Sequence, residues 1–249
     1  MKTIAKIRTD FPTKFGIPRQ SGLVDELKGT VIFEPEYRNA DAIRGLEDFS
    51  HIWLLWKFST GEGESWSPTV RPPKLGGNTR MGVFATRSPF RPNSIGLSCV
   101  RLEKIEFNEA TGAVLHVSGA DLMDKTEIVD IKPYIPYADC HPDATGGFSK
   151  DSSSPQLNVR IPEELLSLIP ADKLTALKKV LALDPRPAYH NDENRVYGFG
   201  FAGIEVKFTV SGNDLNGLIC CLKQMNAVLD PLLVDKLRQR AAVFLMKEP

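Results

Sequence analysis

Two arginines lie close together in a short run that combines polar side chains with a stiff backbone. The run is RMGVFATRSPFRPNSIGL, residues 80–97, and it contains Arg87, Arg91, Pro89 and Pro92. Each proline fixes its own backbone angle and biases the preceding residue toward extended geometry. Guanidinium groups on such a pre-shaped loop suit the capture of an anionic or strongly polar ligand. The alternative is a surface loop whose arginines pair with carboxylates.

The same run resembles the signature FATRSPxRPNPIGLS of the TrmO (TsaA-like, VirR-like) family of tRNA methyltransferases. Further motifs of that family stand in the family's order: KFGIPRQSGL (14–23), FSHIWLLWKF (49–58), VRPPKLGGN (70–78), DLMDKTEIVDIKPYIPYAD (121–139) and DPRPAY (184–189). The sequence departs from the pattern at Ser94, where proline is usual, at Lys125, where glycine is usual, and at His190, where arginine is frequent. None of these departures removes a charged motif residue.

The resemblance implies an enzyme that uses S-adenosylmethionine to methylate tRNA on a small β-barrel. Its implied substrate is threonylcarbamoyladenosine, the modified purine immediately 3′ of the anticodon, and the implied acceptor is N6. The resemblance also implies a homodimer with the cofactor near the interface.

Such a cofactor presents a carboxylate, a ribose and an adenine, and each needs a different partner. Arg87 is the expected polar contact, with Arg91 second, and Asp121 is the expected acceptor for the ribose or the amino group. The expected cofactor-binding residues are Ser21, Gly22, Leu23, Ser59, Thr60, Arg87, Arg91, Leu97, Ser118, Gly119, Ala120 and Asp121. Ordinary structural interpretations remain open, with Gly22 as a turn residue, Leu97 as core and Asp121 as the cap of a turn.

The segment IVDIKPY places Asp130 and Lys132 on one face of an expected strand. These two side chains either form an exposed ion pair, which contributes little to stability, or border the pocket beside Tyr134. We expect Lys132 and Tyr134 to contact the substrate under the second interpretation. His51, within an apolar strand, is interpreted as a hydrogen-bonded core residue.

The DPRPAY motif carries polar groups on a scaffold that two prolines make rigid. It functions either as a helix stop facing solvent or as a substrate contact. Arg186 is the expected substrate-binding residue, because a guanidinium can hold a phosphate or stack on a base, and Tyr189 can stack as well. If the substrate nitrogen needs a base, Asp184 and Tyr189 are the candidate catalytic residues.

The charge of the chain is unevenly distributed. The 249 residues carry no net charge, so the whole molecule is not a general binder of polyanions. Residues 71–104 differ, because they hold seven basic residues and a single acid, a local charge of +6. A basic patch on a neutral protein is typical of nucleic-acid binding through one face. A solvated rim that balances acidic neighbours explains the same pattern.

The remaining chemistry-bearing residues point to no other reaction. The four cysteines and four histidines lack the spacing of a metal site, and no apolar run suits a membrane span or a secretory signal. We therefore expect a reduced cytoplasmic protein without metal. A hydrolase or metalloenzyme is the weakest of three hypotheses, and a non-catalytic RNA-binding barrel is the alternative to the methyltransferase. Binding of S-adenosylmethionine separates these last two.

The elements that must position these residues are mostly short strands. Apolar segments rich in Val, Ile, Phe or Trp, with glycine-containing turns between them, lie at 30–33, 52–58, 81–85, 97–102, 113–117 and 127–131, and one short helix is expected at 41–48. Strands at this spacing, without long alternating helices, predict an antiparallel sandwich or barrel. The expected fold class is mainly β, an antiparallel β-barrel with a small C-terminal α+β appendage.

The expected domains are a cofactor-binding barrel over residues 1–140, a linker over 141–158 and a C-terminal domain over 159–249 that contributes to tRNA binding. In the last domain, helices are expected from Pro162 and over 174–181. A strand at 204–210 with a hairpin mate at 195–201 follows, and Asp230–Pro231 is expected to begin a final helix.

Overall fold

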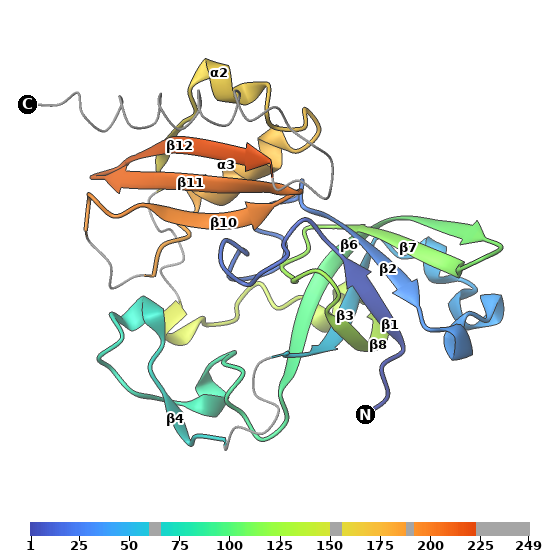
Figure 1. Cartoon of the computed structure of the whole chain (residues 1–249). Helices are drawn as coiled ribbons and strands as arrows, with labels where there is room; N and C mark the ends of the chain where they lie inside the picture. Colours follow the sequence, from blue (N-terminus) through green and yellow to red (C-terminus); the bar gives the residue numbers. More distant parts are fainter. Residues whose placement is uncertain (60–65, 150–155, 188–191, 223–249) are drawn as a thin grey trace, which may run out of the picture.

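The computed structural model describes residues 1–59, 66–149, 156–187 and 192–222, and it contains two units built on β-sheets (Figure 1). The first is a closed barrel, and the second is a four-stranded sheet covered by two helices. No helix among the described residues is long and apolar enough to cross a membrane.

The barrel closes in the strand order β1-β2-β7-β6-β3-β8, with every neighbouring pair antiparallel. Its strands are β1 (Ala5–Arg8), β2 (Lys28–Phe33), β3 (His51–Lys57), β6 (Ile95–Asn108), β7 (Gly112–Ser118) and β8 (Glu127–Pro133). Alternate side chains such as Ile52, Leu54 and Val100 fill the interior, as the period-two pattern of a half-buried strand requires. The predicted antiparallel barrel is confirmed.

The barrel differs from the sequence-based expectation in three places. The expected strand at 81–85 is only β5 (Met81–Gly82), paired with β4 (Thr69–Val70), and then the 3-10 helix η5 (Val83–Ala85). Only Val83 of this run is buried, while Phe84 is exposed, so no packed layer holds the run extended. The expected helix at 41–48 is two 3-10 helices, η2 (Ala40–Ile43) and η3 (Leu46–Asp48), separated by Gly45 in the left-handed region. β1 was not predicted, because four residues are too few for a periodic signal.

Short elements complete the first unit and the connection to the second. These are η1 (Pro35–Tyr37), η4 (Pro73–Leu75), α1 (Pro136–Asp139) and η6 (Gly147–Ser149). The expected linker includes residues 150–155, which lie outside the described part of the chain.

The C-terminal unit has the strand order β10-β11-β12-β9, in which β9 and β12 run parallel. Its elements are β9 (Asn158–Arg160), α2 (Glu163–Leu166), α3 (Leu174–Ala182), β10 (Tyr197–Phe201), β11 (Ile204–Ser211) and β12 (Asp214–Leu222). The predicted hairpin is present as β10 and β11, and the second predicted helix is α3. Pro162 precedes α2 as its N-cap, and the expected helix start at Asp230–Pro231 lies outside the described residues.

The loop between β1 and β2 joins the two units. Phe11, Val24 and Leu27 from this loop pack in the same apolar cluster as α3 and strands β10, β11 and β12. At its edge, Lys173 Nζ lies 2.8 Å from Asp10 Oδ2, and both side chains are largely buried. The barrel's own chain therefore contributes to the C-terminal core, and this contact fixes the loop that leads to residues 20–23.

Candidate functional site

The candidate site lies where β6 and β7 separate. β7 ends at Ser118, which pairs with Arg101, so residues 95–100 of β6 have no β7 partner. The β1–β2 loop covers this free edge, because the Cys99 backbone amide donates to Ser21 Oγ at 3.1 Å. A backbone hydrogen bond of 2.9 Å from the Gly22 amide to the Gly119 carbonyl attaches the loop to the end of β7. Three distant segments of the sequence thus meet at one end of the barrel.

Two glycines allow the backbones to approach closely here. Gly22 and Gly119 have φ angles of 75° and 76°, in the left-handed region that L side chains rarely adopt. A Cβ atom on Gly119 would lie 3.3 Å from both the nitrogen and the Cα of Gly22. The two glycines therefore allow the β1–β2 loop to lie directly against the end of β7, where the Gly22 amide bonds to the Gly119 carbonyl.

Asp121 is the half-buried acid of the site, and a chain of hydrogen bonds orients it. Ser98 Oγ donates to Asp121 Oδ1 at 2.6 Å, and Trp56 Nε1 donates to Ser98 Oγ at 3.0 Å. Burial raises the pKa of Asp121, while the Ser98 hydrogen bond and the Arg87 charge oppose that rise. The Trp56 ring is fixed over Gly96, where a Cβ would lie only 2.3 Å from Cε2. The carboxylate is held in one orientation with one oxygen already engaged.

The two arginines of the signature have different roles. Arg87 is exposed, donates a short hydrogen bond to the side-chain oxygen of Gln20, and acts electrostatically on Asp121. Arg91 is half-buried and donates to the backbone carbonyls of Thr86 at 3.2 Å and Val83 at 3.4 Å. Within the described residues neither arginine forms a salt bridge with a carboxylate. Arg87 is thus available at the site, whereas Arg91 shapes the loop that carries it.

The other expected cofactor residues lie around the same gap, with different degrees of access. Leu23 and Leu97 are 51% and 44% exposed, so Leu97 is apolar surface and not core. The Ser118 hydroxyl donates to Glu103 at 2.5 Å, and its backbone pairs with Lys28 of β2 and Arg101 of β6. Ala120 is buried, and its amide faces the Leu27 carbonyl at 3.4 Å.

Ser59 follows Phe58, whose amide bonds to the Ser94 carbonyl beside the start of β6. Ser59 is exposed, and Thr60 lies outside the described residues.

Sequence reasoning missed Gln20, Ser98 and Trp56. All three lie within the family motifs quoted above, and Ser98 is a polar residue at an inward position of an apolar strand. A buried hydroxyl in a barrel core needs a partner, and that requirement is the signal that points to Asp121.

Residues on the outer face of β3 and β8 form a separate group. The Tyr134 ring packs against Trp53 at 5.8 Å and His51 at 6.2 Å between centroids. Lys132 Nζ lies 3.2 Å from Asp130 Oδ2, and both side chains are well exposed. The ion-pair alternative therefore describes this pair in the structure. His51 is half-buried on the outer surface beside Ser50, so its interpretation as a core residue was wrong.

The described part of the DPRPAY motif, residues 184–187, follows α3 and contains an internal ion pair. Arg186 Nε and Nη2 donate to Asp184 Oδ1 and Oδ2, both at 2.8 Å, and this fork raises the pKa of Arg186. Asp184 has a φ of 50°, which ends the helix. Its carboxylate is fully engaged by the guanidinium, so it is a partner of Arg186 more than a free base. Tyr189 lies outside the described residues.

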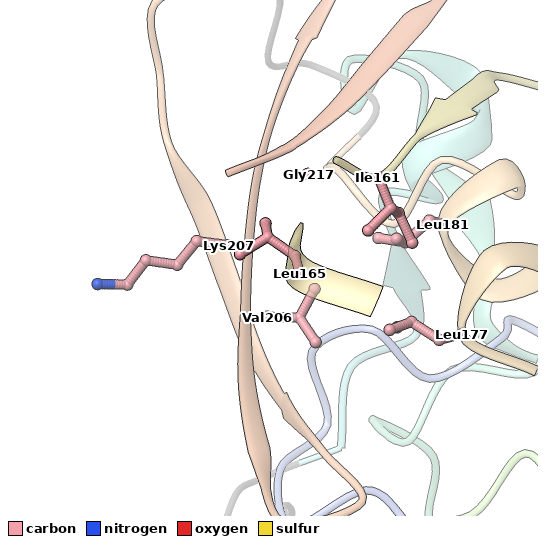
Figure 2. A pocket seen from close by; sticks show the side chains of 7 residues that line it. All are labelled: Ile161, Leu165, Leu177, Leu181, Val206, Lys207 and Gly217. Atoms are coloured by element: carbon pink, nitrogen blue, oxygen red, sulfur yellow. The ribbon is translucent and has the colours of Figure 1, made fainter. Parts of the chain in front are cut away.

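A small pocket in the C-terminal unit offers no chemistry. It lies between the sheet and helices α2 and α3 and is lined by Ile161, Leu165, Leu177, Leu181, Val206, Lys207 and Gly217 (Figure 2). The amine of Lys207 points away from it in Figure 2, so the lining is apolar. No group of three or more His, Cys, Asp or Glu that suits a metal ion occurs within the described ranges.

Comparison with known proteins gives matches over both units. The model of the tRNA-methyltransferase O N-terminal domain matches residues 6–140, and that of the TrmO C-terminal domain matches residues 154–219. The tRNA (adenine(37)-N6)-methyltransferase of Escherichia coli strain K12 is 42% identical over 216 residues, covering 84% of this chain and 92% of that protein. A putative S-adenosylmethionine-dependent methyltransferase, RcsF, of Pseudomonas aeruginosa is 40% identical over 222 residues, covering 85% and 93%.

A solved structure is also similar over most of the chain. The crystal structure of TrmO from Pseudomonas aeruginosa superposes with a TM-score of 0.68 and 33% identity, covering 88% of this chain and 97% of that one. The similarity extends over both units, because its coverage exceeds the barrel alone.

Proposed function

The chain belongs to the tRNA-methyltransferase O family, and we propose that it methylates N6 of threonylcarbamoyladenosine in tRNA, with S-adenosylmethionine as donor. Its enzyme class, a tRNA methyltransferase, follows from the two matching family models and the curated relatives. The observation that carries the finer proposal is the combination of an exposed cation, Arg87, with an oriented carboxylate, Asp121, at the place where β6 and β7 separate.

The residues at this gap fit the polar and apolar parts of S-adenosylmethionine. Arg87 would hold the carboxylate through a charge-assisted hydrogen bond. Oδ2 of Asp121, which does not carry the Ser98 bond, would accept from a ribose hydroxyl or the amino group. Leu23 and Leu97 offer exposed apolar surface for the adenine, and the backbone near Gly119 can approach it closely.

The cofactor, when bound, supplies an already activated methyl group on a sulfonium. The contribution of the protein is to align the acceptor nitrogen, which can contribute up to about 7–11 kcal/mol to catalysis. The hydrogen-bond chain from Trp56 through Ser98 to Asp121 fixes the orientation of one contact before the ligand binds. Arg91 holds the loop of Arg87 through backbone carbonyls. This is positioning chemistry, and the N6 proton that the methyl group replaces must pass to a base or to water.

The C-terminal unit is proposed to help hold the tRNA. Arg186 is held by Asp184 in a planar fork, and the N–H groups that the fork does not use would bind a phosphate or a base through the 14% of the side chain that is exposed. We also propose a homodimer that acts in the cytoplasm, where its substrate occurs. Both rest on the motif resemblance.

A non-catalytic RNA-binding barrel is less compatible with the site. A phosphate bound to Arg87 brings no hydrogen-bond donor for Asp121, whose carboxylate feels the charge of that arginine. The same carboxylate favours a ligand that carries hydroxyl or amino donors as well as an anion.

Calorimetry with S-adenosylmethionine tests this proposal. Arg87→Ala should weaken cofactor binding about 10- to 150-fold, because a hydrogen bond to a charged group contributes about 1.5–3 kcal/mol. The matched control is Arg44→Ala, an exposed arginine that pairs with Asp41 in a different part of the barrel. A wild-type protein that binds RNA but not S-adenosylmethionine would contradict the proposal and favour the RNA-binding barrel.

A further inference from the structure

The connection between β3 and β6 forms an arm, residues 66–94, that is not part of the barrel sheet. Its strands β4 and β5 pair only with each other, Thr69 with Gly82 and Val70 with Met81. Figure 1 shows it as a separate lobe, in teal, beyond the start of β6.

Hydrogen bonds within the arm hold its shape. The Val83 amide donates to the Pro68 carbonyl at 3.0 Å, and the Ser67 amide donates to the Phe90 carbonyl at 3.3 Å. Segment 66–68 is therefore hydrogen-bonded to two later parts of the arm, at Val83 and at Phe90.

Three large aromatic rings of the arm face solvent. Trp66, Phe84 and Phe90 are 51%, 75% and 43% exposed. The Ser67 amide bonds to the Phe90 carbonyl, and the Val83 amide bonds to the Pro68 carbonyl. These two bonds bring the backbones at or next to the three aromatic residues close together in space. Exposed apolar clusters of this kind on a soluble protein usually mark an interaction surface.

The same arm carries positive charge without compensating acids. No Asp or Glu occurs from Trp66 to Leu102, a stretch that holds six basic residues. Arg71, Arg80 and Arg87 are exposed, and within the described residues none of them forms an ion pair with a carboxylate. Arg80 only donates to Thr69 Oγ1 at 2.8 Å. The charge is complementary to a polyanion.

We propose that the arm binds the single-stranded anticodon loop of tRNA, with Phe84 as a stacking platform for an unpaired base and Arg71 and Arg80 as phosphate contacts. Exposed aromatic rings next to arginines are the combination that holds single-stranded nucleic acid, because bases stack on the rings while guanidiniums bind the backbone. Arg87 belongs to the arm and also reaches the candidate cofactor site, where it bonds to Gln20 and acts on Asp121. An anticodon loop bound to the arm would therefore place the nucleotide next to the stacked base near Asp121. This inference rests on the proposed function, whose substrate base lies in that loop.

The test measures binding of an anticodon stem-loop RNA that carries threonylcarbamoyladenosine, by fluorescence anisotropy with the full chain. Phe84→Ala should weaken RNA binding about 5- to 150-fold, the range for the loss of one stacked base. Phe84→Trp should restore it, because the ring is retained. The matched control is Phe107→Ala, a 66% exposed phenylalanine near the far end of β6, which should bind like wild type. Arg71→Gln should reduce the salt dependence of log Kd by a slope of about one.

Three measurements separate the possible failures. Affinity for S-adenosylmethionine should be the same in Phe84→Ala and wild type, which also shows that the variant is folded. If wild type binds the cofactor and methylates tRNA, but Phe84→Ala binds RNA like Phe107→Ala, the arm proposal is overturned and the proposed function stands. If sedimentation shows that Phe84→Ala dissociates a dimer while RNA affinity is unchanged, the arm is an interface between copies, and the proposal is also overturned.

Discussion

Removing the Ser98 hydroxyl is predicted to destabilise the barrel and to make cofactor binding more sensitive to acid. Ser98 is fully buried, donates to Asp121 at 2.6 Å and accepts from Trp56 Nε1 at 3.0 Å. Ser98→Ala leaves the indole N–H without that acceptor, and an unsatisfied buried donor costs about 1–3 kcal/mol. The free energy of unfolding, measured by chemical denaturation, should fall by about that amount.

The acid sensitivity follows from the pKa of Asp121. Burial already raises this pKa, and the Ser98 hydrogen bond partly offsets the rise by favouring the charged form. Without that bond the pKa rises further, so Asp121 becomes protonated at a higher pH. Because the ionised carboxylate is the better acceptor for the cofactor's hydroxyl or amino donor, affinity is present above this pKa and lost as the pH falls through it. The acid limb of the affinity curve should move to higher pH in Ser98→Ala.

Calorimetric titration with S-adenosylmethionine over a pH series measures this limb. Trp56→Phe is the matched control, because it removes the donor to Ser98 but leaves the bond from Ser98 to Asp121. Its acid limb should coincide with that of wild type. If Ser98→Ala also shows the wild-type limb, Asp121 is not the acceptor that the cofactor uses, and the reasoning about this site fails.

Three further changes test other parts of the structure. Lys125 has a φ of 68° at an exposed turn, so Lys125→Gly should relieve strain and raise the free energy of unfolding by about 1 kcal/mol; an equal or lower stability in denaturation would contradict this. Asp10→Ala breaks the ion pair with Lys173 between the β1–β2 loop and the C-terminal unit, and should lower the free energy of unfolding by about 1.5–3 kcal/mol. An unchanged denaturation midpoint would show that packing alone joins the units. Arg186→Ala should slow single-turnover methylation of tRNA, while the affinity for S-adenosylmethionine measured by calorimetry stays at the wild-type value. Methylation by this variant at the wild-type rate would show that DPRPAY only ends a helix.

The sequence predicted the barrel because short apolar segments rich in Val, Ile, Phe or Trp alternate with glycine-containing turns, and no long helices lie between them. The failure at 81–85 has a physical cause: an apolar run becomes a strand only where a neighbouring layer can bury it, and Phe84 has no such layer. Composition cannot distinguish these cases. The short β1 is held by pairing with β2 and β8, which are distant in sequence, so no local pattern could reveal it.

The candidate site was predicted by residue type but not by arrangement. Arg87 and Arg91 are equivalent in the sequence, and only the folded loop shows that Arg91 reaches two carbonyls while Arg87 does not. The hydrogen bond from Ser98 to Asp121 joins a residue of β6 to a residue beyond the end of β7, at the place where these two strands separate. The same limit applies to Phe11, which belongs to the barrel's chain but packs in the C-terminal core.

The central claim is that this chain methylates one modified adenosine in tRNA. Its most direct test incubates the purified protein with S-adenosylmethionine carrying a deuterated methyl group and with tRNA that contains threonylcarbamoyladenosine, followed by nucleoside mass spectrometry. The account predicts that threonylcarbamoyladenosine gains one labelled methyl group on N6 and that Arg87→Ala strongly slows this gain. Label on another nucleoside, or none on tRNA, would contradict it.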